Sequence, residues 1–406
     1  MLKCGLLGKK LGHSYSPQIH GMLADYEYLL YEKSEEELED FVKNGSWRGL
    51  NVTIPYKKDV LPFCNSLSET AAATGSVNTL TKDENGLIRG DNTDVYGFTS
   101  LVWKSGIDVG GKKTLVLGNG GAAASVVHAL KKMGADVTVI SRRGEDNYEN
   151  ISRHSDAQVI VNTTPVGMYP GNGTSPLSLD IFPELTGVLD IIYNPARTAL
   201  LLQAEKRGIR CENGLYMLVA QAKKSSEAFT GERIPDDRIE SVTENLAFQM
   251  SNLVLIGMPG SGKSTIAKAL SEMTGRAVVD TDEEVVEAAE MSIPEIMERF
   301  GQEDFRNRET EAIREAGKQS GVIISTGGGC VLFERNKDLL RQNGRIFWIQ
   351  RDTDLLARRG RPLSKGADLD AMYKEREPYY RDFADAEILN DTTQLDAAVR
   401  VLSSMQ

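Results

Sequence analysis

Residues 252–265 read NLVLIGMPGSGKST and decide the fold of the chain around them. The apolar start predicts a buried strand, and Gly257, Gly262, Lys263 and Ser264 then match the pattern G-x4-G-K-[ST] ahead of an amphipathic helical pattern. In such a loop, backbone N–H groups surround phosphate oxygens, the lysine bridges the β- and γ-phosphates, and the serine hydroxyl binds Mg²⁺. No Asn-Lys-x-Asp guanine motif occurs, so the sequence favours ATP.

Apolar runs and helical patterns alternate over the rest of the chain. The runs that predict buried parallel strands are 115–117, 137–140, 159–161, 253–256, 322–324 and 346–349. Several end in glycine-rich turns followed by helical patterns, as at 122–133 and 265–273. This succession predicts an α/β fold. Polar stretches near 99–111 and 230–250 suggest three lobes. We expect these lobes to be 1–100 (with 223–248 packing back onto it), 101–222 and 250–406.

Composition limits the classes of partner. The 406 residues carry 47 basic and 58 acidic side chains, a net charge of −11, which disfavours nucleic acid or an anionic membrane as the main partner. Four scattered cysteines without a CxxC pair argue against a zinc site or a disulfide framework and for a reducing compartment. The start lacks a secretion signal, and no run approaches 18 apolar residues. We therefore expect a cytoplasmic protein; the sequence does not predict its oligomeric state.

A second glycine-rich turn lies at 114–125, TLVLGNGGAAAS. Gly118, Gly120 and Ala123 form a G-x-G-x-x-A pattern between a strand and a helix, the context of a dinucleotide site. The helix N-terminus would offer N–H groups to a pyrophosphate. The next strand pattern ends in Ser-Arg-Arg at 141–143, where an NAD site usually has a carboxylate. Two arginines suit a 2′-phosphate and favour NADP; the alternative is a solvated basic turn.

The first lobe places isolated polar residues in predicted turns. Ser14 and Ser16 are two residues apart, Lys57 follows NVTIPY, Asn78 lies in GSVNT, and Asp94 ends DNTD. Paired hydroxyls can bind a carboxylate, and a lysine beside an aspartate can exchange a proton with a hydroxyl or ketone. Taken singly, each has an ordinary interpretation as a helix cap, a surface lysine or a turn residue.

Residues 1–230 resemble the shikimate dehydrogenases. The motifs that carry the resemblance are SYS at 14–16, NVTIPYK at 51–57, GSVNT at 75–79, DNTD at 91–94, GNGGAAAS at 118–125, NTTPVGM at 162–168, DIIYNP at 190–195 and NGLYMLVAQA at 213–222. The resemblance implies NADPH-dependent reduction of 3-dehydroshikimate, with Lys57 and Asp94 as the catalytic pair. The implied shikimate site comprises Ser14, Ser16, Asn51, Thr53, Asn78, Asp94, Tyr193 and Gln221. The implied NADP site comprises Gly118, Gly120, Gly121, Ser141, Arg142, Arg143 and Gly214.

Two features depart from that family. Ser141 stands where the family usually has asparagine, and the stretch between Arg143 and Val159 is shorter than usual. Family members that act on quinate with NAD also exist, so quinate stays open as an alternative substrate.

The last lobe holds further polar clusters after the phosphate loop. Asp280 and Asp282 follow an apolar run, where a carboxylate could accept a proton from an acceptor hydroxyl and another could hold Mg²⁺. Three glycines at 327–329 would let backbone approach a substrate, and the arginines in 358–361 suit phosphates. The alternatives are helix caps, a tight turn and a solvated face.

Residues 252–390 resemble the shikimate kinases. The motifs are GMPGSGKST at 257–265, VVDTD at 278–282, SIPEIMERFGQEDFRNRE at 292–309, STGGG at 325–329, RPL at 361–363 and REPYY at 376–380. The implied ATP site comprises Gly260, Ser261, Gly262, Lys263, Ser264, Thr265 and Arg361, with Ser264 and Asp280 toward Mg²⁺. The implied shikimate site comprises Asp282 as base, Arg306 and Arg376 on the carboxylate, and Gly328 and Gly329 against the ring. One residue, Gly360, separates Arg359 from Arg361, where the family has a longer lid.

Together the two resemblances predict a bifunctional enzyme of aromatic amino-acid biosynthesis. Its dehydrogenase part (residues 1–250) would make shikimate, and its kinase part (residues 251–406) would phosphorylate it. Expected cofactors are NADP(H), ATP and Mg²⁺, with small molecules as the only predicted partners. The alternatives are a quinate-type dehydrogenase joined to another small-molecule kinase, and a regulatory protein with one inactive part.

Overall fold

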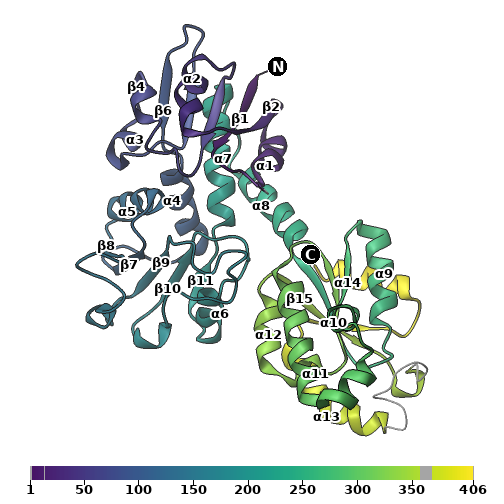
Figure 1. Cartoon of the computed structure of the whole chain (residues 1–406). Coiled ribbons are helices and arrows are strands. Elements are labelled where there is room, and N and C mark those ends of the chain that lie inside the picture. Colours follow the sequence, from purple (N-terminus) through teal and green to yellow (C-terminus); the bar gives the residue numbers. More distant parts are fainter. Residues whose placement is uncertain (1, 13, 357–367, 406) are drawn as a thin grey trace. The chain divides into compact units, whose positions relative to one another are not determined.

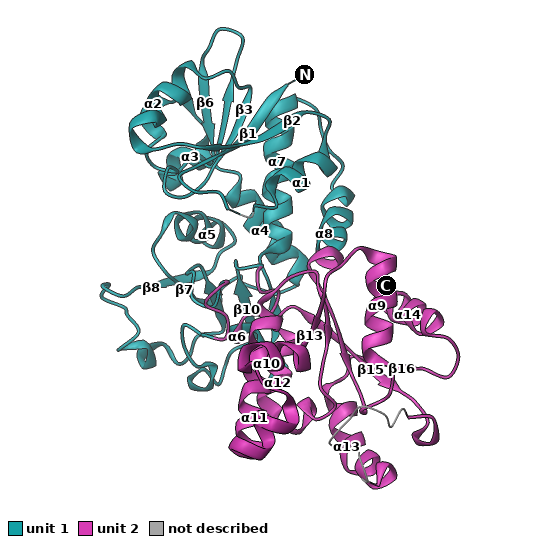
Figure 2. Ribbon diagram, turned by 45° about the vertical axis from the view of Figure 1, so that its right-hand side comes forward, with its two compact units in different colours: residues 1–168, 174–193, 200–246 teal, residues 169–173, 194–199, 247–406 magenta. Residues whose placement is uncertain are grey.

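The computed structural model describes residues 2–12, 14–356 and 368–405. The chain forms two units, drawn in teal and magenta in Figure 2. The first comprises Met1–Met168, Thr174–Tyr193 and Leu200–Leu246, and the second comprises Tyr169–Gly173, Asn194–Ala199 and Ala247–Gln406. The α/β prediction is confirmed in both units.

The first unit begins with a six-stranded sheet in the order β2-β1-β3-β5-β6-β4. Its strands are β1 (Lys3–Gly8), β2 (Glu27–Glu32), β3 (Gly49–Val52), β4 (Ser66–Leu67), β5 (Thr79–Lys82) and β6 (Ile88–Asp91). The associated helices are α1 (Ser16–Leu23), α2 (Glu35–Asn44) and α3 (Glu69–Thr74). β2 and β3 run parallel to β1, whereas β5 is antiparallel to both β3 and β6. Buried side chains such as Leu7, Leu50 and Tyr56 form its core.

The second sheet of this unit is parallel throughout, in the order β11-β10-β9-β7-β8. Its strands are β7 (Lys113–Leu117), β8 (Asp136–Ile140), β9 (Val159–Asn162), β10 (Gly187–Asp190) and β11 (Arg210–Glu212). The helices that follow or flank it are α4 (Asp94–Ser105), α5 (Gly121–Lys132), α6 (Ala199–Lys206), α7 (Leu215–Thr230) and α8 (Asp237–Met250). Phe98 of α4, Val126 of α5 and Met217 of α7 share one buried cluster, so three helices are fixed against the strands.

The connection from β8 to β9 agrees with the short segment noted in the sequence. It contains one 3-10 turn, Ile151–His154, and no α-helix. Its residues bond mainly among themselves: the Ser141 N–H donates to the Asp146 carbonyl (3.1 Å), and His154 Nε2 lies 2.8 Å from Asp146 Oδ1. Apolar side chains of the same connection, Tyr148, Ile151 and Ala157, pack into a buried cluster of this unit, so the segment is held to the core without a crossover helix.

The second unit contains a parallel five-stranded sheet in the order β13-β14-β12-β15-β16. Figure 1 labels β15 of this sheet. Its strands are β12 (Asn252–Ile256), β13 (Val278–Asp280), β14 (Ile323–Ser325), β15 (Gly344–Gln350) and β16 (Ala386–Leu389). Its helices are α9 (Lys263–Thr274), α10 (Thr281–Ala289), α11 (Ile293–Lys318), α12 (Glu334–Arg341), α13 (Leu369–Phe383) and α14 (Gln394–Ser403). Gly301 interrupts α11 with φ 86° and ψ 172°, so the helix is two segments. The strand order reverses beside β12, the position where open α/β sheets bind ligands.

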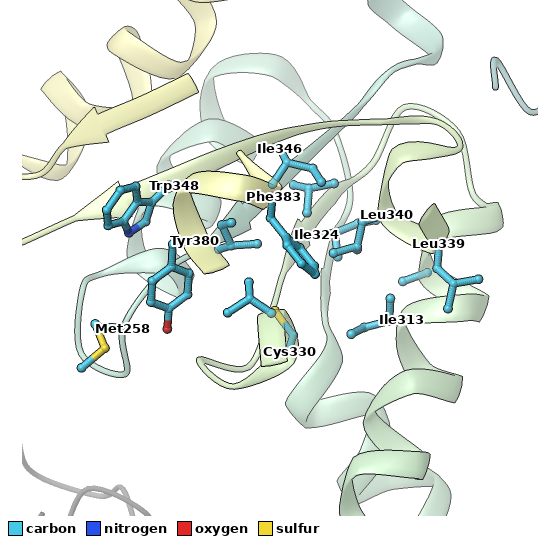
Figure 3. Packing of buried hydrophobic residues seen from close by; sticks show 14 of the residues in the cluster. Met258, Ile313, Ile324, Cys330, Leu339, Leu340, Ile346, Trp348, Tyr380 and Phe383 are labelled. Carbon is cyan, nitrogen blue, oxygen red and sulfur yellow. The ribbon is translucent and has the colours of Figure 1, made fainter. Parts of the chain in front are cut away.

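Aromatic packing ties this core to one loop of the site. The Trp348 and Tyr380 rings stack at 5.7 Å, and both are fully buried beside Phe383 (Figure 3). The Tyr380 hydroxyl then donates to the Gly328 carbonyl at 2.5 Å. The loop after β14 is therefore anchored to the hydrophobic core. Within the described ranges, no helix combines the length and apolar character needed to cross a bilayer.

Candidate active sites

Lys57 and Asp94 form an ion pair in the first unit. Lys57 follows β3, Asp94 opens α4, and Lys57 Nζ lies 2.6 Å from Asp94 Oδ2. The two side chains are only 19% and 9% exposed, so water screens the pair weakly. A lysine held this way can pass a proton to a nearby oxygen while its partner keeps it oriented.

Amide side chains surround the aspartate. Asn78 Nδ2 donates to Asp94 Oδ1 at 2.9 Å and lies 3.4 Å from Gln221 Oε1. Asn51, on β3, donates through Nδ2 to Ser225 of α7 at 2.8 Å. Residues from β3, β5, α4 and α7 thus meet, as the sequence motifs require if they form one site.

The remaining predicted shikimate residues lie on adjoining loops. The Ser16 N–H donates to Ser14 Oγ at 3.2 Å, so this serine pair also shapes the turn into α1. Tyr193 follows β10, and its ring meets Tyr15 edge-on at 6.1 Å, which brings it to the same turn. Thr53 follows β3, where its N–H donates to the Leu7 carbonyl at 3.0 Å.

The N-terminus of α5 suits a dinucleotide phosphate. Gly118 has φ 104°, Gly120 has open space around its Cα, and no side chain caps the helix. The unpaired N–H groups of the first turn therefore face outward without a side chain in front of them. A Cβ placed at Gly121 would lie 3.9 Å from Lys57 Cδ, so the helix end is next to the Lys57–Asp94 pair.

Two other parts of the predicted cofactor site, the turn after β8 and the residue before α7, differ in how exposed and how tightly packed they are. After β8, Ser141 is buried, whereas Arg142 and Arg143 are exposed, as side chains must be to reach a ligand phosphate. Gly214 precedes α7, and a Cβ there would lie 2.0 Å from the Ile191 carbonyl oxygen. Only glycine fits at 214, which lets the chain pass close beside Tyr193.

The phosphate loop lies between β12 and α9 as predicted. Lys263 is buried, and its Nζ donates to the carbonyls of Gly257 (2.9 Å) and Met258 (3.1 Å). Ser264 Oγ donates to Asp280 Oδ2 at 3.2 Å. Asp280 also caps α10 through the Asp282 N–H at 3.1 Å, so the capping interpretation of this residue holds as well.

A cavity of about 460 Å³ adjoins this loop. Its lining includes all the acceptor-site residues predicted from the sequence: Asp282, Arg306, Gly328, Gly329 and Arg376. Arg376 Nη1 donates to the Gly328 carbonyl at 3.0 Å. A Cβ at Gly329 would lie 2.3 Å from Arg306 Nη2, so this glycine lets the guanidinium lie against the backbone.

A buried ion pair inside this cavity was not predicted. Arg306 Nη1 lies 2.6 Å from Glu309 Oε2, and their side chains are 5% and 0% exposed. Burial raises the pKa of the Glu309 carboxyl, and the Arg306 guanidinium opposes that rise. A buried arginine needs a counter-charge, and the acid three residues later in RNRE was the available signal.

The oxygen atoms near the phosphate loop suit Mg²⁺ carried by a nucleotide. Ser264 Oγ and Asp280 Oδ2 are adjacent hard ligands, and Mg²⁺ commonly takes its other ligands from phosphates and water. The described residues contain no group of three or more His, Cys, Asp or Glu side chains arranged for a metal. Arg361 lies outside the described residues.

Comparisons with known proteins show which families the two parts of the chain resemble. Family models match at residues 6–80 (Shikimate dehydrogenase substrate binding domain), 106–168 (Putative NAD(P)-binding) and 259–406 (Shikimate kinase). The shikimate dehydrogenase (NADP(+)) of Caldicellulosiruptor bescii is 38% identical over 251 residues, which cover 55% of this chain and 87% of that protein.

Solved structures resemble the same part of the chain. A chorismate mutase/shikimate 5-dehydrogenase fusion protein from Clostridium acetobutylicum is 36% identical, with a TM-score of 0.58, over 61% of this chain and 97% of that one. Shikimate 5-dehydrogenase from Thermus thermophilus, solved with NADP(H) and shikimate, is 30% identical, with a TM-score of 0.56, over 60% and 99%.

The chain belongs to the shikimate dehydrogenase family. Its C-terminal residues form a shikimate kinase domain, so the recognition of both families from sequence is confirmed. The dehydrogenase part contains Lys57, Asp94 and the α5 turn, and the kinase part contains the phosphate loop and the 460 Å³ cavity. Besides Glu309, sequence reasoning missed Tyr28 and Ser225, which both contact Asn51.

Proposed function

We propose that the chain is a bifunctional enzyme that makes shikimate 3-phosphate from 3-dehydroshikimate in two steps. NADPH reduces the ring ketone to give shikimate and NADP⁺, with one proton taken up. ATP then phosphorylates shikimate, with ADP and a proton released. The observation that carries this proposal is the presence in one chain of a shikimate dehydrogenase and a shikimate kinase domain, each with its charged residues in place.

In the dehydrogenase part, the protein provides binding and proton transfer. Bound NADPH supplies the hydride, and the α5 N-terminus with Arg142 and Arg143 would hold its phosphates. Lys57 Nζ gives a proton to the oxygen that was the ketone, and Asp94 keeps Nζ aimed at it. The amides of Asn51, Asn78 and Gln221, the Thr53 and Tyr193 hydroxyls, and the serines at 14 and 16 would hold the hydroxyls and carboxylate of the ring.

In the kinase part, the basic and the acidic side chains that line the cavity have different roles. Arg306 and Arg376 would bind the shikimate carboxylate, a pairing that planar guanidinium groups favour. Asp282 would accept the proton of the attacking hydroxyl. The loop at Gly260–Thr265 would hold the ATP phosphates, with Ser264 and Asp280 toward Mg²⁺, which neutralises phosphate charge when bound.

The compartment follows from the thiols. Cys4, Cys64, Cys211 and Cys330 are free in the described structure, and two of them are buried. Free thiols persist in reducing compartments, so we assign the enzyme to the cytoplasm.

The test is a two-step conversion with the full-length protein. Incubation with 3-dehydroshikimate, NADPH, ATP and Mg²⁺ should yield shikimate 3-phosphate by mass spectrometry. Lys57→Ala should block reduction yet still phosphorylate added shikimate, whereas Asp282→Asn should accumulate shikimate. If the wild-type protein reduces 3-dehydroquinate to quinate but does not reduce 3-dehydroshikimate, the substrate assignment is wrong.

A further inference from the structure

Buried hydrogen bonds connect the Lys57–Asp94 pair with Asn51. Asp94 uses Oδ2 for Lys57 and Oδ1 for Asn78 (2.9 Å), and an ionised carboxylate only accepts. Asn78 must therefore turn its nitrogen toward Asp94. Its oxygen accepts the Thr93 N–H at 2.8 Å, a donor that cannot reverse. The orientation of the Asn78 amide follows from these two contacts alone.

The direction of the next bonds follows from counting protons. Thr79 Oγ1 lies 3.0 Å from Asn78 Oδ1 and 2.9 Å from Ser225 Oγ, and its single proton can serve only one of these contacts. Ser225 Oγ donates to the Gln221 carbonyl at 3.0 Å, one turn earlier in α7. Ser225 Oγ can then only accept from its remaining neighbours. Asn51 must turn its nitrogen toward Ser225, from which Nδ2 is 2.8 Å away.

Tyr28 of β2 completes this arrangement. Its hydroxyl donates to Asn51 Oδ1 at 2.8 Å, so the oxygen of this amide is occupied. One Asn51 N–H is used by Ser225, and Nδ2 lies a longer 3.5 Å from Thr79 Oγ1, at the limit of a hydrogen bond. Asn51 is 6% exposed. Because Tyr28 occupies the amide oxygen, a substrate hydroxyl at this amide would meet an N–H donor rather than the carbonyl oxygen.

The Tyr28 ring is itself held firmly. It stacks on His20 with centroids 4.0 Å apart and planes 10° apart. His20 Nδ1 lies 2.5 Å from the Tyr26 hydroxyl and 3.1 Å from Ser226 Oγ. Burial lowers the pKa of His20 to about 3, although a hydrogen bond with Asn51 opposes the shift, so the imidazole is neutral at physiological pH.

We propose that Tyr28 is a positioning residue for the dehydrogenase reaction. By bonding to the Asn51 oxygen, it makes Asn51 present a hydrogen-bond donor to one ring hydroxyl of the substrate. Tyr28 acts through Asn51 and does not touch the reacting atoms. This inference rests on the proposed dehydrogenase function.

The first experiment compares two tyrosines of β2 in the full-length protein. Tyr28→Phe removes the hydroxyl but keeps the stacked ring, and the KM for shikimate should rise about 3- to 10-fold, the value of one buried hydrogen bond. The KM for NADP⁺ and the kinase kinetics should stay within about twofold, since neither site contains this hydroxyl. Tyr31→Phe is the matched control, because the Tyr31 ring packs on Phe41 at 4.8 Å, and it should resemble wild type.

A double-mutant cycle separates positioning from general destabilisation. In an Asn51→Ala background, Tyr28→Phe should raise the shikimate KM by less than about twofold, since its target is gone. Equal effects in both backgrounds, or no effect in either, would overturn the proposal.

Should Tyr28→Phe unfold at a lower temperature, Asn51→Asp tests the donor directly. The introduced carboxylate would still accept from Tyr28 but would offer no N–H to the substrate. Wild-type affinity in Asn51→Asp would also overturn the proposal. A wild-type protein that does not oxidise shikimate at all would instead refute the function on which it rests.

Discussion

Gly329→Ala adds one methyl group against the buried Arg306 guanidinium. Gly329 has φ −107° and ψ 2°, which alanine adopts without strain, so the variant reports contact rather than backbone conformation. The new Cβ would lie 2.3 Å from Arg306 Nη2, whereas ordinary contact begins near 3.5 Å. The guanidinium must then move by about 1 Å. Glu309 restrains the Arg306 guanidinium through a 2.6 Å ion pair, and the Glu309 side chain is fully buried.

A 1 Å error in a substrate-holding group costs on the order of 100-fold, or about 2.7 kcal/mol. We therefore expect the shikimate KM of the kinase part to rise about 30- to 100-fold, with the KM for ATP within about twofold. A coupled assay of ADP release measures the KM values for shikimate and ATP. The dehydrogenase activity of the same sample shows that the protein is folded. In an Arg306→Lys background the added alanine should have little further effect, because the shorter ammonium group leaves space. An unchanged shikimate KM in Gly329→Ala would refute the placement of Arg306 beside this glycine as a substrate contact.

Four further outcomes are expected. Lys57→Ala should lower the dehydrogenase kcat by about 10²- to 10⁴-fold with a shikimate KM within a few-fold, measured by NADPH absorbance; wild-type turnover would remove Lys57 from the chemistry. Arg142→Ala should raise the KM for NADPH about 10-fold and leave that for NADH unchanged; equal changes would show that Arg142 does not face the 2′-phosphate. Asn390→Ala removes a 2.7 Å bond to the Ser261 carbonyl and should raise the KM for ATP about 3- to 10-fold without changing that for shikimate. The pKa of His20 is lowered to about 3 on folding, so its contribution to stability is present above about pH 6.5 and is lost as pH falls toward 3. Acid unfolding followed by circular dichroism should accordingly become less pH-dependent in His20→Asn over that range.

The sequence predicted those parts of the fold that depend on local pattern. The apolar run 252–256 followed by a glycine loop can only be a strand turning into a helix, and the structure shows β12 and α9 there. Lys57 and Asp94 were paired by family resemblance, because they are 37 positions apart and the chain between them carries no local signal that they meet. In the dehydrogenase part, the runs 115–117, 137–140 and 159–161 correspond to β7, β8 and β9, whereas no apolar run predicted β10, β11 or the strands of the first sheet.

The contacts that were missed depend on tertiary structure. Tyr28 alternates with exposed residues on an edge strand, where its pattern is that of any half-buried tyrosine. Ser225 lies inside α7, and nothing in its neighbours indicates that it accepts from an asparagine 174 residues earlier. Hydrogen-bond direction depends on which protons are already in use, and that requires all partners to be known.

The interruption at Gly301 has a mechanical consequence. An unbroken helix from Ile293 to Arg306 would transmit any tilt of its start over roughly 20 Å, at 1.5 Å per residue, and swing the arginine tip. Because the backbone leaves helical geometry at 301, such a tilt is not carried along one continuous helix axis. The two segments still meet through side chains, since Ile296 and Phe305 share one buried cluster. Mutations at Ile293, which lines the pocket, therefore reach Arg306 through side-chain packing and not through the helix backbone. Substitutions at this position, whether natural or selected by an inhibitor, can therefore change how a ligand fits the pocket while the Arg306–Glu309 ion pair is kept.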